Sequence, residues 1–302
     1  MAFLLLSYPE RGAVWRRVFH EAGEDLWVGT DEVRDAAAVT HLACWQPPDL
    51  SAYPSLRVLL SVGAGVDHMP PLPPGVALVR TVAPGIDRMV RDWVVMATLM
   101  LHRDMPTYLE GARQGRWQQH PVRLAASRRV GILGLGRIGR LAAETLAGLG
   151  FEVAGWSRSG TPLPGIETHG AAGLDAFLAR TDILICLLPL TGSTRGLLNA
   201  GLFAKLPRGA HLVHAGRGAQ LDMAALSDAL DAGRLASAML DVTDPEPLPA
   251  DHPAWADPRI VITPHVAANT DPEEGARHAL AVLSAWRAGR PLPGLVDPEA
   301  GY

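Results

Sequence analysis

Three side chains with complementary chemistry follow a glycine-rich string in this sequence. The string is Gly134-Leu135-Gly136-Arg137-Ile138-Gly139. Further along the chain come Arg217 between two glycines, Glu246 between two prolines, and His265 after Thr263-Pro264. A fixed cation, a carboxylate and an imidazole can together bind an acidic substrate and transfer a proton. Behind a nucleotide-binding loop, these groups suit hydride transfer to a 2-keto acid.

The glycine string has the context that a dinucleotide site needs. It follows a predicted strand, Val130–Leu133, and begins a predicted helix, Ile138–Leu149. The first glycine permits the tight turn, the second lets the backbone approach a pyrophosphate, and the third allows close packing of helix on sheet. The phosphates then meet the positive end of the helix. In another context the string would indicate only a glycine-rich turn.

The strand after this helix carries the cofactor preference. It ends Gly155-Trp156-Ser157-Arg158-Ser159, with no acidic residue. An NAD site usually places Asp or Glu there to hold the ribose hydroxyls. A serine hydroxyl and an arginine guanidinium instead suit the 2′-phosphate of NADPH. The sequence therefore favours NADPH, with NADH as the alternative cofactor; otherwise Arg158 is an ordinary surface residue.

The three side chains divide the expected chemistry. Arg217 follows a predicted strand, Ala210–His214, and so lies at a carboxyl end, where open α/β sheets bind ligands. Its planar guanidinium can hold carboxylate and carbonyl oxygens together. His265 is the candidate proton donor, and Glu246 is the carboxylate that would fix its tautomer and favour the imidazolium form. Each residue alone is compatible with a structural role, and only the constellation supports catalysis.

Small residues also follow a strand near the N-terminus, in Val62-Gly63-Ala64-Gly65-Val66-Asp67. Their backbone N–H groups can form an anion-binding nest for a substrate carboxylate. A plain turn with Asp67 as a helix cap is the alternative. A second nucleotide motif is disfavoured because the third glycine is missing. Trp45, at the end of its strand, either walls the substrate pocket or belongs to the core.

Length and composition exclude several classes of protein. The chain has 302 residues, 48% hydrophobic and 19% charged, which suits two globular domains. A net charge of −4 offers no basic surface for nucleic acid or an anionic membrane. The most apolar helical stretch, Trp93–Leu101, falls below the roughly 18 residues of a membrane span. Cys44 and Cys186 lie in apolar runs without metal-ligand spacing, so no metal is expected and a cytoplasmic, reducing location fits.

Short aliphatic runs alternate with amphipathic helices along the whole chain. This alternation predicts an α/β fold with parallel sheets covered on both faces. Two such series suggest two Rossmann-like or flavodoxin-like domains, with the nucleotide-binding domain inserted in the substrate-binding domain. Periodicity alone does not reveal the insertion. The expected boundaries are 1–95 and 268–302 for the substrate-binding domain and 96–267 for the dinucleotide-binding Rossmann domain.

Taken together, the motifs resemble the D-2-hydroxyacid dehydrogenase family over nearly the whole chain, and most closely its members that reduce glyoxylate and hydroxypyruvate. Such a set is far more specific than any single motif. Besides the glycine string and the strand before it, the resemblance is carried by Gly63–Asp67, Gly155–Arg158, Leu187–Pro189, Arg217-Gly218, Leu240–Val242, Glu246–Leu248, Ile262–Ala268 and Gly301-Tyr302.

The resemblance implies reduction of a small 2-keto acid, such as glyoxylate or hydroxypyruvate, to the D-2-hydroxy acid with NADPH. It implies that Arg217 binds the substrate, that His265 is the acid/base and that Glu246 is its partner. The implied substrate contacts are Trp45, the backbone of Ala64 and Gly65, and Arg217. The implied cofactor contacts are Gly134, Leu135, Gly136, Arg137, Ile138, Gly139, Ser157, Arg158, Leu188, Pro189, Thr194, Ala215 and Asp241.

The chain also departs from the family pattern. His214 stands where an asparagine is often found, Gly216 where alanine or serine is usual, and Arg91-Asp92-Trp93 replaces a Glu-Tyr or Glu-His stretch. These changes bear on the pocket and not on the fold. The resemblance further implies a homodimer joined through the nucleotide domain and the long helix that begins near Arg88. Trp117 falls where some relatives lend a tryptophan to the neighbouring subunit's pocket.

Other functions remain as alternatives. A larger 2-keto acid is one, because the departures fall on loops that shape the pocket. A formate dehydrogenase would pair the histidine with glutamine, whereas this chain has Glu246, and a phosphoglycerate dehydrogenase would carry a regulatory domain after residue 302. A non-enzymatic nucleotide-sensing binding protein could keep the same three side chains, since fold alone does not fix function. Such proteins usually carry partner-binding extensions that this chain lacks.

Overall fold

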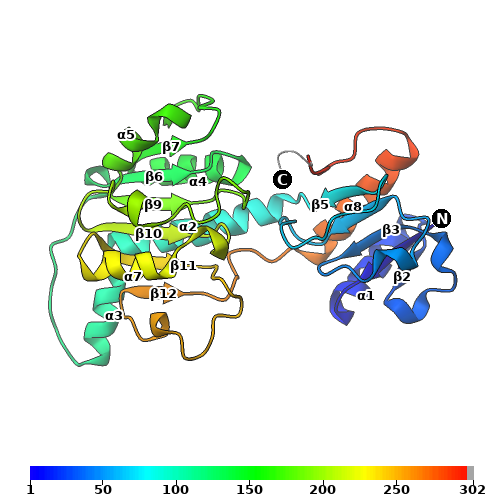
Figure 1. Ribbon diagram of the computed structural model, residues 1–302, viewed down its shortest axis with the longest axis horizontal. Coiled ribbons are helices and arrows are strands. Elements are labelled where there is room, and N and C mark those ends of the chain that lie inside the picture. The colour runs from blue at the N-terminus through cyan, green and yellow to red at the C-terminus, as the bar shows by residue number, and fades with distance from the viewer. Residues whose placement is uncertain (298–302) are drawn as a thin grey trace. The chain divides into compact units, whose positions relative to one another are not determined.

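The computed structural model describes residues 1–297 and divides the chain into two compact units (Figure 1). Unit 1 comprises Met1–Ile86 and the chain from Asn269 onward, and unit 2 comprises Asp87–Ala268. The first division falls inside helix α2 (Pro84–His102), upstream of the boundary expected near residue 95. The second falls beside the boundary expected near residue 267. The motif Gly301-Tyr302 lies outside the described residues.

Unit 1 contains a five-stranded sheet in the order β2-β1-β3-β4-β5. Every neighbouring pair of strands is parallel. Because a parallel sheet is covered on both faces, its strands are continuous apolar runs and do not alternate with polar residues. The strands are β1 (Ala2–Leu6), β2 (Leu26–Val28), β3 (Val39–Cys44), β4 (Val58–Ser61) and β5 (Ala77–Arg80).

Two helices cover one face of this sheet, α1 (Pro9–Glu21) and α8 (Pro272–Arg287) (Figure 1). Trp15 and Phe19 of α1 stack with their ring centroids 5.8 Å apart, above Phe3 of β1. The other face packs against short 3₁₀ segments and loops. Those segments in unit 1 are η1 (Thr30–Glu32), η2 (Ala36–Ala38) and η3 (Leu50–Ala52).

Unit 2 contains a seven-stranded parallel sheet in the order β12-β11-β10-β9-β6-β7-β8. The chain runs outward from β6 through β7 to β8, then returns to the other side of β6 and continues from β9 to β12. The carboxyl ends of β6 and β9 therefore form a topological switch point, where sheets of this kind bind ligands. The strands are β6 (Arg129–Leu133), β7 (Glu152–Trp156), β8 (Glu167–His169), β9 (Ile183–Cys186), β10 (Ala210–His214), β11 (Leu235–Leu240) and β12 (Ile260–Ile262).

Helices and apolar side chains of unit 2 pack on both faces of its sheet. One cluster joins Phe177, Phe203 and Leu226 from three different helices to the central strands. Besides α2, the helices are α3 (Met105–Arg113), α4 (Arg137–Gly148), α5 (Leu174–Ala179), α6 (Ala200–Phe203) and α7 (Met223–Asp231), with 3₁₀ segments η4 (Ala125–Ser127), η5 (Ala171–Gly173), η6 (Gly218–Gln220) and η7 (Pro253–Trp255).

The predicted fold class is confirmed, since both sheets are parallel and both belong to α/β units. Several short elements were not predicted. Strands β2 and β8 have three residues each and lie at the sheet edges, and α6 has four residues. Such segments are too short to show a hydrophobic period, and pairing with a neighbouring strand or helix stabilises them.

Cys44 and Cys186 are buried free thiols. Burial raises the pKa of each thiol to about 12, so both stay protonated at neutral pH. Among residues 1–297, no helix is long and apolar enough to cross a membrane. The same residues contain no group of three or more His, Cys, Asp or Glu side chains that could hold a metal ion.

Candidate active site

The glycine string connects β6 to α4 at the switch point of unit 2. Gly134 has a φ of 103°, and a Cβ on Gly139 would lie 1.8 Å from the Gly134 carbonyl oxygen. The protein's own packing therefore requires glycine at both positions. A Cβ on Gly136, by contrast, would meet nothing within 4 Å. Internal packing does not explain Gly136, which leaves room for a ligand at the start of the helix.

The start of α4 fits a pyrophosphate. Gly136 caps this helix without a side-chain hydrogen bond, and the first N–H groups of an α-helix have no partner inside the helix. These groups and the helix dipole attract an anion. The guanidinium of Arg137 donates two hydrogen bonds to the Asp87 carboxylate, at 3.0 and 2.8 Å. Arg137 therefore contributes its backbone to the loop, while its side chain points to Asp87. Of the other two predicted contacts, Leu135 is buried and Ile138 is half-buried.

The end of β7 lies beside the glycine string. The N–H of Gly134 donates to the Trp156 carbonyl oxygen at 2.9 Å. The Ser157 hydroxyl then accepts from the N–H of Gly160 at 3.2 Å, which closes a turn that carries Arg158 at the surface. A hydroxyl and a guanidinium thus follow the strand at the position where the ribose of a dinucleotide is usually bound.

The loop after β9 lies on the other side of the string. A Cβ on Gly134 would be 3.0 Å from the Leu187 carbonyl oxygen. The Thr194 hydroxyl donates to the Pro189 carbonyl oxygen at 2.7 Å and accepts from the N–H of Thr191 at 2.8 Å, so this side chain shapes the loop. The remaining predicted contacts here are Leu188, which is buried, and Ala215, which is half-buried after β10.

Arg217 lies just beyond the carboxyl end of β10 and is half-buried. Its backbone is extended, with φ −140° and ψ 140°, and its N–H donates to Gln220 Oε1 at 2.8 Å. One guanidinium nitrogen donates to the Gly216 carbonyl oxygen at 2.8 Å. A Cβ on Gly218 would lie 1.9 Å from the Thr243 carbonyl oxygen, so the loop of Arg217 packs directly on the strand-end loop that precedes Glu246.

His265 and Glu246 form the pair that their motifs predicted. His265 Nδ1 lies 2.8 Å from Glu246 Oε2, and the two side chains are 37% and 38% exposed. The second carboxylate oxygen of Glu246 accepts from the N–H of Thr243 at 3.0 Å. One oxygen of Glu246 is therefore held by the Thr243 backbone while the other accepts from Nδ1–H, and the Nε2 atom of the ring is not used in this pair.

A buried carboxylate holds the loop that carries His265. Asp241, which is 2% exposed, accepts three hydrogen bonds from this loop. They come from Thr263 Oγ1 at 2.6 Å, the N–H of Val266 at 2.9 Å and the N–H of Ala267 at 2.8 Å. Asp241 lies among the predicted cofactor contacts, and that contact stays a prediction. The hydrogen bonds that the structure shows for Asp241 go to the His265 loop and hold that loop in place.

His265 has a left-handed backbone, with φ 54°. For a residue other than glycine this conformation costs on the order of 1 kcal/mol and persists only where the surroundings impose it. Here the N–H of His265 donates to the Asp241 carbonyl oxygen at 2.8 Å. The hydrogen bonds of Asp241 on both sides of His265 therefore hold the backbone that aims the imidazole.

The predicted substrate residues of unit 1 surround a tight turn after β4. Ser61 Oγ donates to the Gly65 carbonyl oxygen at 2.9 Å, and the N–H of Thr81 donates to the Gly63 carbonyl oxygen at 3.0 Å. Ala64 and Gly65 are half-buried. Trp45 is 43% exposed, and a Cβ on Gly63 would lie 2.7 Å from its ring. The indole therefore packs directly against the turn, and His68 stacks on it with centroids 3.9 Å apart.

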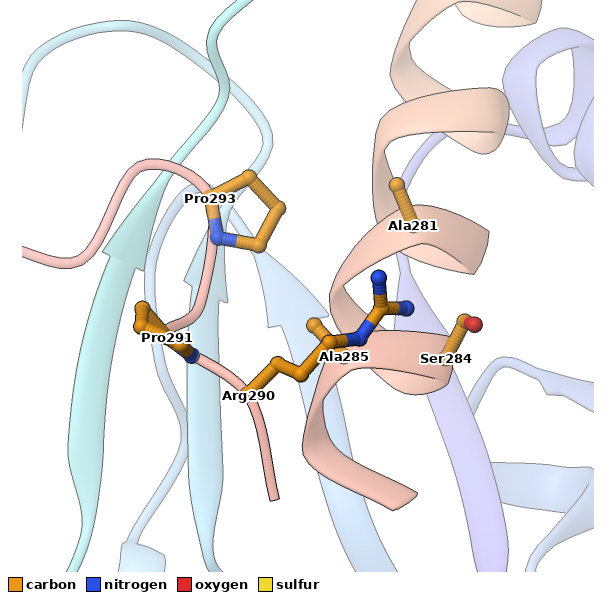
Figure 2. Close-up of a pocket in the computed structure, with 6 residues that line it drawn as sticks. All are labelled: Ala281, Ser284, Ala285, Arg290, Pro291 and Pro293. Carbon is orange, nitrogen blue, oxygen red and sulfur yellow. The ribbon is translucent and has the colours of Figure 1, made fainter. Parts of the chain in front are cut away.

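A hollow of about 490 Å³ lies elsewhere in unit 1, between one face of α8 and the segment that follows it (Figure 2). Figure 2 shows the Arg290 side chain extending toward that face of α8, with Pro291 and Pro293 on the other side. None of the predicted site residues lines this hollow. It is lined by Ala281, Ser284, Ala285, Arg290, Pro291 and Pro293.

Several side chains that position the site were not predicted. The Thr263 hydroxyl accepts from Trp93 Nε1 at 3.1 Å while it donates to Asp241, so α2 also supports the His265 loop. Gln220 Oε1 accepts a hydrogen bond from the N–H of Arg217. Both polar residues lie within three positions of a predicted active-site residue, and that proximity is the only signal of their roles in the sequence.

Comparisons with known proteins show the family of this chain. The family model described as D-isomer specific 2-hydroxyacid dehydrogenase, NAD binding domain, matches residues 95–267. The chain belongs to this family. It is 38% identical to glyoxylate/hydroxypyruvate reductase A of Yersinia enterocolitica over 279 residues, which is 89% of each chain.

Solved structures of the family resemble the whole chain of this dehydrogenase. An NADPH-dependent glyoxylate/hydroxypyruvate reductase from Sinorhizobium meliloti, in complex with NADP and sulfate, has a TM-score of 0.93 and 38% identity, and all of both chains is covered. A D-isomer specific 2-hydroxyacid dehydrogenase from Xanthobacter autotrophicus Py2, in complex with NADPH and MES, has a TM-score of 0.91 and 35% identity over 100% of this chain and 99% of that one. The protein is therefore an NAD(P)-dependent 2-hydroxyacid dehydrogenase.

The role of Asp241 in this dehydrogenase can be tested with Asp241→Asn. The new NH₂ group would face N–H donors, so at least one hydrogen bond to the His265 loop is lost, at a cost of about 1–3 kcal/mol. We expect a lower melting temperature and a kcat reduced by about tenfold or more, because the imidazole is no longer held in place. Steady-state kinetics and thermal unfolding measure the two effects.

Asp182→Asn is the matched control. Asp182 also accepts from a backbone N–H and a guanidinium, both of Arg129, but at the amino end of the same sheet. Its replacement should lower stability and leave kcat intact. If Asp241→Asn behaved in the same way, Asp241 would support the fold alone and not the position of His265.

Proposed function

We propose that this dehydrogenase reduces a small 2-keto acid, glyoxylate or hydroxypyruvate, to the D-2-hydroxy acid with NADPH. The observation that carries the proposal is the 2.8 Å pair of His265 and Glu246, backed by Thr243 and placed on the same unit as Arg217 and the glycine string. Glu246 fixes the orientation of the imidazole, and a carbonyl that becomes an alkoxide needs a proton from a donor in a fixed position. Formate oxidation has no such need, so Glu246 favours the keto-acid reaction.

The residues of unit 2 divide the reaction as follows. A dinucleotide held by the glycine string and by Ser157 and Arg158 would supply the hydride for the carbonyl carbon. Arg217 binds the keto acid through charge-assisted hydrogen bonds and polarises its carbonyl oxygen. His265 donates the Nε2 proton to that oxygen while its Nδ1–H stays hydrogen-bonded to Glu246. In the reverse direction neutral His265 accepts the proton.

Unit 1 supplies the features that favour a compact substrate. We propose that the N–H groups of Ala64 and Gly65 bind the substrate carboxylate, since the carbonyl oxygens of this turn are already bound by Ser61 and Thr81. The bulk of Trp45 against Gly63 limits the room beside the turn. Relatives at 34–38% identity that are named glyoxylate/hydroxypyruvate reductase A support the same substrate size.

The cofactor preference rests on the turn after β7. Ser157 and Arg158 offer a hydroxyl and a guanidinium, and no carboxylate, where the ribose is expected. Two relatives with TM-scores above 0.9 have been solved with NADP or NADPH. We therefore propose NADPH as the preferred cofactor, with NADH as the weaker alternative.

We also propose a homodimer. The segment between α3 and β6 exposes Trp117 at 96%, Val122 at 71% and Leu124 at 79%. Apolar side chains gathered on one exposed segment indicate a surface that a second copy covers. A solution mass near twice 32.2 kDa would support this assembly, and a monomer mass would contradict it.

Oxidation of NADPH and NADH by the purified protein tests the proposed function directly. Glyoxylate, hydroxypyruvate, pyruvate and a bulkier 2-keto acid are each offered separately. We expect the highest kcat/KM with NADPH and the two small acids. Activity confined to the bulky acid would contradict the proposed substrate class. Tight cofactor binding with no turnover of any acid would instead favour a nucleotide-sensing role.

Replacement of His265 and replacement of Arg217 should change the steady-state kinetics in different ways. His265→Ala removes the proton donor and should lower kcat by about 10²- to 10⁴-fold with little change in KM. Arg217→Ala removes a group that binds both substrate and transition state, so KM should rise as kcat falls. Steady-state kinetics with the best keto acid measure both, with the surface variant His20→Ala as the control. Full activity of His265→Ala would exclude this residue as the proton donor.

Arg158→Ala tests the cofactor preference. Loss of a charge-assisted hydrogen bond to the 2′-phosphate should weaken NADPH binding by roughly tenfold and spare NADH. Titration of each dinucleotide by fluorescence measures the two dissociation constants. Arg277→Ala, another exposed arginine, should change neither. Equal losses for NADPH and NADH would show that Arg158 does not recognise the phosphate.

A further inference from the structure

His214 is the last residue of β10 and is fully buried. Its Nε2 lies 2.9 Å from the Arg217 carbonyl oxygen. A carbonyl only accepts hydrogen bonds, so Nε2 carries the hydrogen and donates it. The structure thus fixes the ring tautomer, and the donor reaches across two intervening residues to hold the backbone of Arg217 in its loop.

Gln220 holds the same residue from the other side. Its side chain is fully buried, and its Oε1 accepts the N–H of Arg217 at 2.8 Å. Its Nε2 donates to the carbonyl oxygens of Leu188 at 3.2 Å and Pro189 at 3.0 Å. One amide side chain therefore links the backbone of Arg217 to the segment after β9, from which cofactor contacts are expected.

Gly216 provides the space for both side chains. A Cβ at this position would lie 2.3 Å from Gln220 Oε1 and 3.2 Å from His214 Cε1. The Gln220 side chain cannot move aside cheaply, because both ends of its amide are hydrogen-bonded in a buried environment. A side chain at position 216 would therefore displace Gln220 and also crowd the His214 ring.

We propose that His214 and Gln220 are positioning residues that fix the backbone of Arg217 at both its carbonyl and its N–H, and that Gly216 is required by them. This inference rests on the proposed role of Arg217 in binding the substrate. A long arginine side chain has many rotamers, and a fixed backbone reduces the number that must be ordered when the keto acid binds. Gln220 additionally connects this position to the Leu188–Pro189 segment.

The protonation state of His214 suits this role. Burial lowers its pKa to about 4, so the ring is neutral through the whole neutral range. The Nε2 donor persists there without a second positive charge beside Arg217. His214 should consequently add no ionisation to the pH–rate profile between about pH 5 and 9.

Two substitutions at position 214 test the proposal. His214→Phe keeps a planar ring and removes the donor, whereas His214→Gln keeps an amide N–H that can reach the Arg217 carbonyl oxygen. We expect His214→Phe to lower kcat/KM for the keto acid by about 10- to 100-fold, mainly through a higher KM, with the dissociation constant of NADPH unchanged. His214→Gln should recover most of that loss.

His211→Phe is the matched control. His211 is a second buried histidine on β10, and its Nδ1 lies 2.9 Å from Ser237 Oγ and not from the Arg217 loop. Its replacement should lower the melting temperature while the KM for the keto acid stays unchanged. If both histidine variants lost stability equally and neither changed KM, His214 would serve packing alone and the proposal would be overturned.

Gln220→Met tests the second half of the proposal. Methionine has a similar length and cannot exchange hydrogen bonds with Arg217, Leu188 or Pro189. We expect a higher KM for the keto acid, as in His214→Phe, together with a severalfold higher dissociation constant for NADPH. An unchanged NADPH affinity would remove the proposed link to the Leu188–Pro189 segment.

An Arg217→Lys background separates this inference from the proposed function. Lysine has no planar fork to align, so His214→Phe should cost less there than in the native protein, and the two losses should not multiply. Full activity of Arg217→Lys and Arg217→Ala would contradict the proposed function itself. Impaired Arg217 variants combined with a fully active His214→Phe would contradict only the positioning role.

Discussion

The buried carboxylate of Asp241 is the interaction on which the geometry of His265 depends. Three hydrogen bonds from Thr263, Val266 and Ala267 converge on its two oxygens. A buried carboxylate with that many donors leaves the loop little freedom. Without it, the left-handed backbone of His265 would have no compensation, and the imidazole would not stay within 2.8 Å of Glu246. The His265–Glu246 pair therefore depends on Asp241, which lies at the end of the neighbouring strand β11.

Parallel strands explain why the other groups lie at the same edge of unit 2. The glycine string follows β6, Ser157 follows β7, the Arg217 loop follows β10, and Asp241 and Thr263 follow β11 and β12 directly. Each lies within a few residues of a carboxyl end, and those ends share one edge in a parallel sheet. Backbone bonds such as Gly134 N–H to Trp156 then join neighbouring strand-ends. The sheet thus brings together residues that lie far apart in sequence.

Features with a local sequence signal could be predicted, and features that depend on distant contacts could not. The bounds of β10 match the predicted run Ala210–His214, because all five residues of this run are buried in the strand. The contact between Glu246 and His265 was expected from their complementary chemistry and from the resemblance to a known family. The donors that surround Asp241 and Gln220 gave no such signal, since a buried polar side chain looks the same in sequence whether it binds a loop, a ligand or water.

Two glycines also show that the sequence cannot separate a structural role from a ligand-binding role. In sequence, Gly136 and Gly216 both look like residues of a functional loop. In the structure, a Cβ on Gly216 would collide with Gln220, whereas a Cβ on Gly136 would enter open space beside the start of α4. Glycine at position 216 is therefore required by packing within the protein, whereas no internal contact requires glycine at position 136. Only the position that packing leaves unexplained is evidence for a ligand, and it lies at the helix end that an anion prefers.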